Sequence, residues 1–257
     1  MKSLLIIFLS ILVSVSSYSQ KDSSDISHWH SYPIPSNQDT LMKYNWSKSE
    51  WHLQKCGRKV YASLSKDIKG DKKLPFELKA STAKEKEELT GDISFIEVDD
   101  GYLVSFWRGE FGGSLYWFDK KGEARKKVAR AMIVQFIRRD DKIYAIAGLA
   151  HMGYSNGGII ELRKENGEWK LFDYVPLHDA PYAIDMDKQK NFIVVTSSHL
   201  FSVDQKKNVD TLVAKGFWDM LYPTSLVVNK KQIFIGMRQG VYKFDLATRK
   251  EEWLMLE

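Results

Sequence analysis

Three acidic residues and three histidines are the residues of this sequence best suited to chemistry. Each lies where an apolar run gives way to a turn: Glu110, Asp179 and Asp219, and His151, His178 and His199. Two carboxylates on one surface could serve as the acid and the base or nucleophile of glycoside hydrolysis. The histidines together with Asp179 offer ligand types that zinc accepts. Neither spacing is diagnostic, so we expect no metal and no cofactor, and the catalytic residues stay unknown.

Aromatic, arginine and amide side chains share these positions, and the combination favours binding over catalysis. The candidate ligand-binding residues are Arg108, Glu110, Phe111, His151, Tyr154, Asn156, His178, Asp179, His199, Trp218, Asp219, Tyr222 and Arg238. Arg108 and Arg238 could clamp carboxylate or carbonyl groups. Trp218, Tyr154 and Tyr222 could supply apolar anchoring area.

These residues indicate a non-enzymatic module that binds a protein, peptide or glycan. Neutralising or scaffolding another exported protein would suit such a module. The alternative is a glycosidase-like hydrolase that uses carboxylates of the same surface. The sequence contains none of the G-x-S-x-G, H-E-x-x-H, G-x-G-x-x-G or P-loop patterns that would name another reaction.

A repeat of about 41 residues positions these groups. Apolar strands are expected to begin at residues 60, 102, 143, 192 and 233, and second strands at residues 74, 115, 159, 200 and 241. Six of the eight intervals are 41 or 42 residues long. A further strand precedes most first strands, and a more polar strand follows most second strands. Four strands in each unit of this length are typical of a propeller blade.

The repeat predicts an all-β fold, a five-bladed β-propeller of four-stranded antiparallel blades over residues 46–257. A two-sheet β-sandwich is the alternative. A lone blade cannot bury both of its faces, whereas blades stacked around an axis bury one sheet against the next. Blade one is the weakest, because its outer strand would fall in residues 83–89, a Lys- and Glu-rich stretch that favours helix. Residues 28–36 could supply an extra edge strand.

The propeller geometry brings the candidate residues to one end. We name the strands of each blade A to D from the axis outward. Successive antiparallel strands reverse direction, so B–C and D–A loops emerge at one end and A–B turns at the other. All thirteen candidate residues fall in or beside B–C and D–A loops. The A–B turns carry mostly Asp, Lys, Arg and Asn, and we interpret them as solvated turns.

Two segments resemble known propeller repeats. Residues 233–248 read Ile-Phe-Ile-Gly-Met-Arg-Gln-Gly-Val-Tyr-Lys-Phe-Asp-Leu-Ala-Thr, and this segment is similar to the blade repeat of sensor-type propellers. Met237 and Arg238 depart from the small Thr or Ser of that repeat. Residues 109–118 resemble a segment of exported bacterial β-propeller-like proteins of unassigned activity. Neither resemblance implies an enzyme.

The N-terminal residues predict export. Residues 1–3 include a lysine, residues 4–13 form an apolar run, and residues 17–19 read Ser-Tyr-Ser, which is the pattern of a secretory signal peptide. We expect cleavage after Ser19, a partly extended segment over residues 20–45, and a secreted or periplasmic protein. No second apolar segment reaches the length of a membrane span, so none is expected after signal cleavage.

Composition limits the partners. Of the 257 residues, 44% are apolar and 13% aromatic, which excludes a disordered, collagen-like or coiled-coil chain. The formal charge of +5 is a mild excess that is spread over the chain, so no nucleic-acid partner is expected. The single cysteine, Cys56, excludes an intrachain disulfide and is predicted to be a small core residue.

Overall fold

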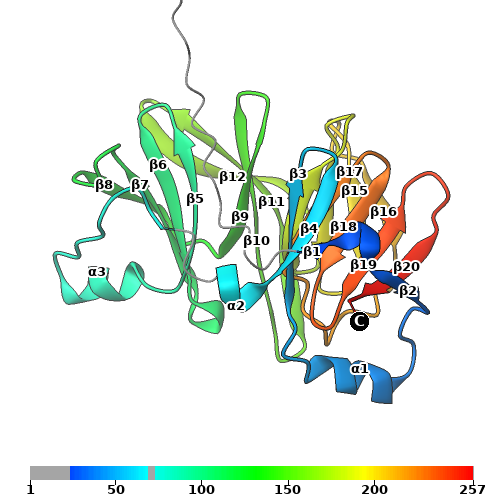
Figure 1. Ribbon diagram of the computed structural model, residues 1–257. Coiled ribbons are helices and arrows are strands. Elements are labelled where there is room, and N and C mark those ends of the chain that lie inside the picture. Colours follow the sequence, from blue (N-terminus) through cyan, green and yellow to red (C-terminus); the bar gives the residue numbers. More distant parts are fainter. Residues whose placement is uncertain (1–23, 69–72, 257) are drawn as a thin grey trace, which may run out of the picture.

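The computed structural model describes residues 24–68 and 73–256. The predicted signal peptide, residues 1–19, lies outside these ranges. Within them, no helix is both long enough and apolar enough to cross a bilayer. The described chain forms five antiparallel sheets, which are not the two sheets of a β-sandwich (Figure 1).

Sheets two, three and four each contain four strands in the order of the sequence. Sheet two comprises β5 (Asp92–Val98), β6 (Gly101–Trp107), β7 (Gly113–Phe118) and β8 (Arg125–Ala129). Sheet three comprises β9 (Ile133–Arg139), β10 (Lys142–His151), β11 (Tyr154–Glu165) and β12 (Glu168–Pro176). Sheet four comprises β13 (Pro181–Met186), β14 (Phe192–Thr196), β15 (Leu200–Val203) and β16 (Val209–Val213). These strands follow the predicted repeat closely.

Sheets five and one are less regular. Sheet five comprises β17 (Ser225–Asn229), β18 (Gln232–Gly236), β19 (Val241–Asp245) and β20 (Glu251–Met255), with β2 (His30–Tyr32) at its edge. Sheet one comprises β3 (Trp51–Cys56), β4 (Lys59–Leu64) and the two-residue β1 (Ser24–Asp25). The extra edge strand expected within residues 28–36 is therefore present as β2, and it pairs with the last strand of the sequence.

The sheets succeed one another around an axis. Strand β5 packs on β9, β9 on β13, β13 on β17, and β17 on β3. These strands are the innermost of their sheets, so sheets two to five and then sheet one follow in turn. No residue of the outer strands β8 and β16 is buried, whereas every residue of β14 is buried. The number of sheets matches the five predicted blades.

The prediction of a strand at residues 74–78 is wrong. Leu74, Phe76 and Leu78 instead pack on the apolar face of sheet two, where the ring of Phe76 lies 5.1 Å from that of Phe118. Pro75 has no N–H to donate to a sheet ladder, which disfavours a strand there. The helical preference of the following residues is confirmed, because α3 (Ala83–Glu88) begins at an N-terminal cap from Thr82. A short helix, α2 (Ser65–Ile68), follows β4.

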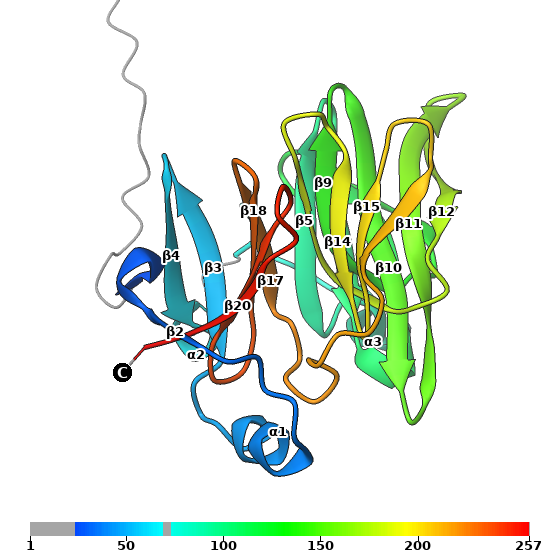
Figure 2. The same ribbon diagram turned by 90° about the vertical axis from the view of Figure 1, so that its right-hand side faces the viewer.

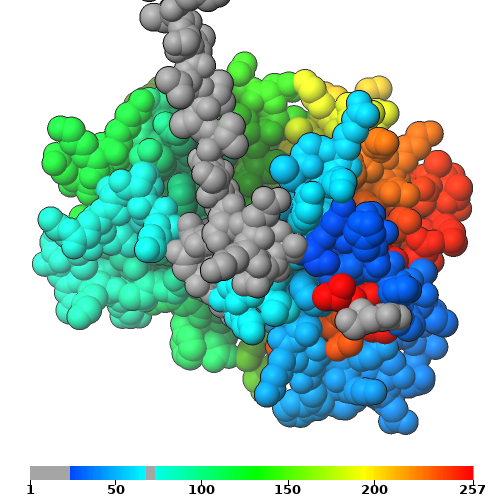
Figure 3. Space-filling model, viewed as in Figure 1, coloured from blue at the N-terminus to red at the C-terminus, as the bar shows by residue number. Residues whose placement is uncertain are grey.

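Residues 24–32 join the first sheet to the last, and we call them the N-terminal clasp. Within the clasp, β1 pairs with β4, the 3-10 helix η1 (Ile26–His28) follows, and β2 pairs with β20. The buried Trp29 meets Trp51 edge to face, with ring centroids 4.8 Å apart, and donates a hydrogen bond to Ser24 Oγ. Figure 3 shows the dark blue clasp between the cyan strands of sheet one and the orange and red strands of sheet five.

Two further features complete the fold. Helix α1 (Gln38–Asn45), capped by Asn37, lies at one end of the sheets, together with the hairpin that joins β10 to β11 (Figure 2). Cys56 is exposed at the end of β3, beside the β3–β4 turn, so the prediction that it is a core residue is wrong. A residue next to a turn at the end of a strand projects beyond the apolar layer that covers its sheet.

Candidate functional site

The B–C and D–A loops of sheets two to five lie at the end of the molecule that carries α1, and we call it the B–C end (Figure 2). The 3-10 helix η2 (Gly109–Phe111) joins β6 to β7 there, and the β10–β11 hairpin contacts it. Six of the nine large apolar side chains that are exposed in the described residues gather at this end: Met42, Trp46, Phe111, Met152, Tyr154 and Tyr222.

Candidate residues of sheets two and three meet at the B–C end. The Nε2 atom of His151 lies 2.7 Å from Glu110 Oε2, and both side chains remain nearly half exposed. Phe111, Met152 and Tyr154 are neighbours of these two residues in the sequence and are 73%, 92% and 59% exposed. The amide of Asn156 donates a long hydrogen bond to the Tyr154 hydroxyl group. The result is a group of uncovered apolar side chains around a polar pair.

Each of the two candidate arginines hydrogen-bonds a helix. Arg238 Nη1 donates to the Asn45 carbonyl oxygen at 3.1 Å and to Asn45 Oδ1 at 2.6 Å, and its guanidinium lies over the Tyr222 ring. Arg108 Nη1 donates to Oε1 of Glu87, which lies in α3. Both guanidinium groups therefore fasten a helix to the sheets with some of their donors, and their role as ligand clamps stays a prediction.

The prediction that Trp218 offers an exposed ring is wrong. Its side chain is fully buried in the core between sheets four and five, and its Nε1 donates to the Thr196 carbonyl oxygen at 3.0 Å. The rings of Phe217 and Tyr242 pack around it. The loop folds back because burial of this large ring removes much apolar area from water. The hydrogen bond of its one polar atom keeps that burial favourable.

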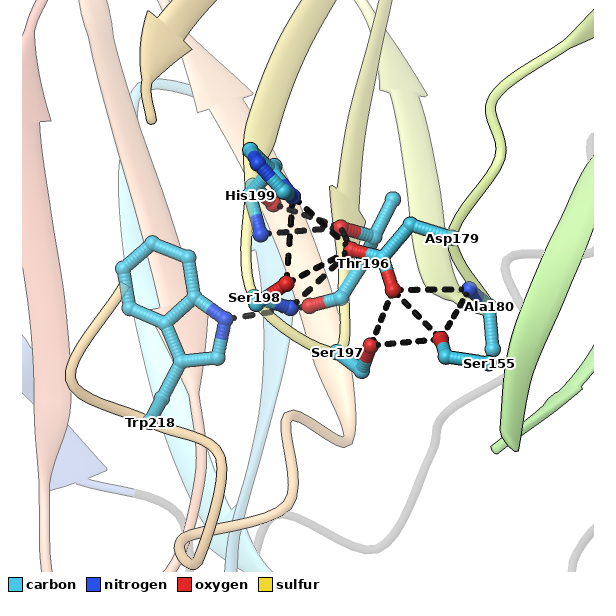
Figure 4. A network of polar contacts seen from close by, with 8 residues as sticks. All are labelled: Ser155, Asp179, Ala180, Thr196, Ser197, Ser198, His199 and Trp218. Atoms are coloured by element: carbon cyan, nitrogen blue, oxygen red, sulfur yellow. Dashed lines mark hydrogen bonds and ion pairs between the residues drawn. The ribbon is translucent and has the colours of Figure 1, made fainter. Parts of the chain in front are cut away.

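Asp179 is the centre of a polar network that joins sheets three and four (Figure 4). Its carboxylate accepts seven hydrogen bonds, from the side chains of Ser155, Thr196, Ser197, Ser198 and His199 and from the backbone N–H groups of Ala180 and Ser198. We call this network the Asp179 hub. Ser155 comes from β11, and the other side-chain donors come from the end of β14 and the loop that follows it. The hub therefore fixes the loop before β13 and the loop after β14.

Hydrogen bonding determines the charge of the hub. Burial alone would raise the pKa of Asp179, but the hydrogen bonds from His199 and the surrounding hydroxyl groups outweigh it and hold this pKa well below its usual value. The carboxylate is therefore ionised. Since an ionised carboxylate only accepts, His199 Nδ1, 3.0 Å from Asp179 Oδ2, must be the donor. Such an engaged carboxylate is poorly suited to act as a general acid.

The remaining candidates do not join the hub. His178 and Asp219 are exposed, and His178 has a left-handed backbone with φ 52°. Asp219 acts on a neighbour: burial raises the pKa of Tyr182 to about 12, and the negative charge of Asp219 adds to the effect. Over residues 24–68 and 73–256, no three His, Cys, Asp or Glu side chains lie close enough together to hold a metal ion.

Sequence reasoning missed the hydroxyl donors of the hub. The run Thr196, Ser197 and Ser198, placed directly after an apolar strand and before His199, is the signal that could have revealed them. Short hydroxyl side chains at a strand end are common donors to a buried carboxylate. Their partner Ser155 comes from another sheet, and nothing in the spacing of the sequence indicates that contact.

Comparisons with known proteins place the fold. No protein-family model matches the chain, and no curated protein sequence matches it either. The extracellular domain of BT4673 from B. thetaiotaomicron, described as a one-component system, is 15% identical with a TM-score of 0.51, over 81% of this chain and 26% of that one. A second structure of that domain gives 13% identity and a TM-score of 0.50 with the same coverage.

A third solved structure is virginiamycin B lyase from Staphylococcus aureus, with 10% identity and a TM-score of 0.45 over 65% of this chain and 56% of that one. The chain thus spans from about a quarter to just over half of the length of these proteins. At such identities the likeness concerns the fold alone. Together with the five sheets, it defines an all-β protein with the architecture of propeller-type extracellular domains.

Proposed function

We propose that this chain is an exported, non-enzymatic, five-bladed propeller that binds a protein ligand at its B–C end. The observation that carries the proposal is the exposure of Phe111, Met152 and Tyr154 on loops of two neighbouring sheets. Strand β10 contacts η2, which brings these loops together, and exposed apolar side chains that gather on a monomer often mark a site for a partner. Export rests on the signal-peptide pattern of residues 1–19.

The chemistry of the surface favours a protein over a glycan. Met152 and Met42 carry flexible, polarizable side chains that can adapt to the side chains of a partner. Tyr154 and Tyr222 combine apolar area with a polar tip, as residues at the centre of protein interfaces often do. Glu110 and His151 supply polar groups beside the apolar ones.

Two of the three carboxylates that the hydrolase alternative could use already have partners, and the third, Asp219, is exposed. Glu110 pairs with His151, and Asp179 accepts the seven hydrogen bonds of its hub. The hub instead supports binding, because it holds the loops after β12 and β14 in fixed positions. Loops held by a rigid scaffold lose less conformational entropy when a ligand binds.

The test uses the mature protein and peptides selected by phage display. We expect selected peptides to bind F111A/M152A/Y154A at least tenfold more weakly than the unchanged protein. The control V209A removes an apolar side chain that is exposed on β16, away from this end, and should bind normally. All three side chains are exposed, so the melting temperature should stay the same. Peptides that bind the triple variant at full strength would refute the proposed surface, and a glycan-array signal lost in that variant would replace the protein ligand with a glycan.

A further inference from the structure

A groove of about 1270 Å³ lies at the opposite end of the molecule, which we call the A–B end. The turns that join β3 to β4, β13 to β14 and β17 to β18 line it, together with the face of sheet five that looks toward sheet one. The β3–β4 and β17–β18 turns lie at the upper end in Figure 2. Sheet one has only three strands, and β1 contributes two residues, so the outer part of that face stays uncovered.

The acidic side chains of the groove are all engaged. Three form ion pairs, namely Asp25 with Lys59, Asp210 with Arg249, and Glu252 with Lys243. The other two accept hydrogen bonds from their own turns, Asp187 from Asn191 and Asp245 from Ala247 and Thr248. The ion pairs balance three of these carboxylates, whereas the hydrogen bonds leave the negative charges of Asp187 and Asp245 in place.

Four cationic side chains of the groove have no acidic partner among the described residues: Arg58, Lys188, Lys230 and Lys231. They come from the turns of three different sheets, which the fold places around one hollow. Seven cationic and five acidic side chains line the groove, which gives it a net charge of +2. An excess of positive charge in a hollow raises the local concentration of anionic ligands. The groove is thus suited to a ligand that carries several negative charges.

The other lining groups narrow the class of ligand. Gln232, Ser31 and Ser202 line the groove with amide and hydroxyl groups, which can hydrogen-bond the hydroxyl groups of a sugar. The aromatic rings of Trp29 and Phe234 are buried in its floor. Exposed rings on which bases could stack are a main feature of single-stranded nucleic-acid sites, and this lining offers none.

We propose that this groove is a second ligand site, which binds an acidic polysaccharide through its carboxylate or sulfate groups. Lys230 and Lys231 hold adjacent positions in the β17–β18 turn and are both exposed, so they can be replaced without disturbing the core. Lys120 and Lys121 provide a matched pair, since they are also adjacent and exposed in a turn, but between β7 and β8 of sheet two.

The experiment measures binding of polygalacturonate and of heparin by isothermal titration calorimetry at several salt concentrations. We expect K230Q/K231Q to weaken binding of at least one of them tenfold or more and to reduce the salt dependence by about two released counterions. K120Q/K121Q has the same net charge and should bind within twofold of the unchanged protein. Binding of polygalacturonate alone identifies a carboxylated glycan, and binding of heparin alone a sulfated one.

Three results would overturn the proposal: no binding of either glycan, an equal loss in both double variants, or equally tight binding of neutral dextran or single-stranded DNA. The F111A/M152A/Y154A variant keeps the two proposals separate. It should bind the acidic glycan normally, because its substitutions lie at the other end of the molecule. A failure of either site therefore leaves the other unaffected.

Discussion

At the scale of single residues, Asp179 illustrates how a buried charge can be made stable. Removing a carboxylate from water costs several kcal/mol, and that cost is offset only when its oxygens accept good hydrogen bonds. Here seven donors from two sheets surround the two oxygens. The charge therefore fixes the positions of its donors, and with them the loops at the B–C end.

We predict that D179N lowers the free energy of unfolding by about 3 kcal/mol. The amide keeps the shape of the carboxylate but presents two N–H groups to neighbours that must themselves donate. Urea denaturation measures the loss. D219N removes the charge of the exposed Asp219 in the next D–A loop, and it should change stability by less than about 0.5 kcal/mol. Equal losses of stability in D179N and D219N would mean that the hydrogen bonds of the hub do not stabilise the fold.

The difference in stability between the unchanged protein and D179N should depend on pH in one direction. The folded protein holds the pKa of Asp179 below its ordinary value of 3.8. The stability that this group contributes is therefore complete above that value and is lost as the pH falls toward the folded pKa. The difference between the unchanged protein and D179N should shrink below about pH 4. A difference that grows in acid would contradict this assignment.

The candidate residues show what sequence can and cannot reveal at this scale. Repeat spacing places Glu110, His151 and Tyr154 at one end, because strand direction alone decides it. Spacing does not reveal that the Trp218 side chain is buried in the core. A loop whose tryptophan points inward has the same sequence pattern as a loop whose tryptophan is exposed. The engagement of Arg238 by α1 depends equally on tertiary packing, between residues that are far apart in the chain.

At the scale of elements, Arg238 hydrogen-bonds the end of α1 to the B–C loop of sheet five, while Leu41 and Tyr44 of the helix pack on the core. We predict that R238A increases hydrogen exchange over Gln38–Asn45 and lowers the free energy of unfolding by about 1–2 kcal/mol, because both bonds to Asn45 are lost. Exchange monitored by mass spectrometry checks this. R249A breaks an exposed ion pair with Asp210 and should leave exchange in α1 unchanged. Unaltered exchange in both variants would show that packing alone holds α1.

The repeat predicts strands well where each unit supplies its own partners. Sheets two, three and four arise from consecutive hairpins, so the local apolar pattern is sufficient. Sheet one does not arise from consecutive hairpins alone. Its third strand, β1, precedes β3 and β4 in the sequence and pairs with β4. The apolar residues 74–78 satisfy the pattern of a strand, yet they cover the face of sheet two that has no neighbouring sheet packed on it.

At the scale of the whole molecule, the N-terminal clasp connects sheet one to sheet five through the buried Trp29. We predict that W29A lowers the free energy of unfolding by about 3–5 kcal/mol, since it leaves a cavity against Trp51 between the two sheets. W46A is the matched control, because Trp46 is 79% exposed, and it should change stability by less than about 0.5 kcal/mol. Thermal unfolding followed by circular dichroism distinguishes the two. Similar losses in both variants would argue against the clasp.

The two ends of the molecule differ in chemistry, and only one difference could be predicted from the sequence. The B–C end presents apolar side chains, which the composition of its loops indicates. The groove at the A–B end depends on a strand that sheet one does not have, and a repeat that predicts five equal blades cannot reveal such an absence. From the sequence, the lysines of the A–B turns are therefore interpreted only as residues of solvated turns.

The pairing of β2 with β20 also sets an order in time. His30 cannot meet Met255 until the ribosome has also made the more than 200 residues between them, so β2 must wait for β20. Contacts between such distant positions are slow to form. Until they do, the outer edge of β20 has no partner strand, and such an unpaired edge is open to pairing with another chain.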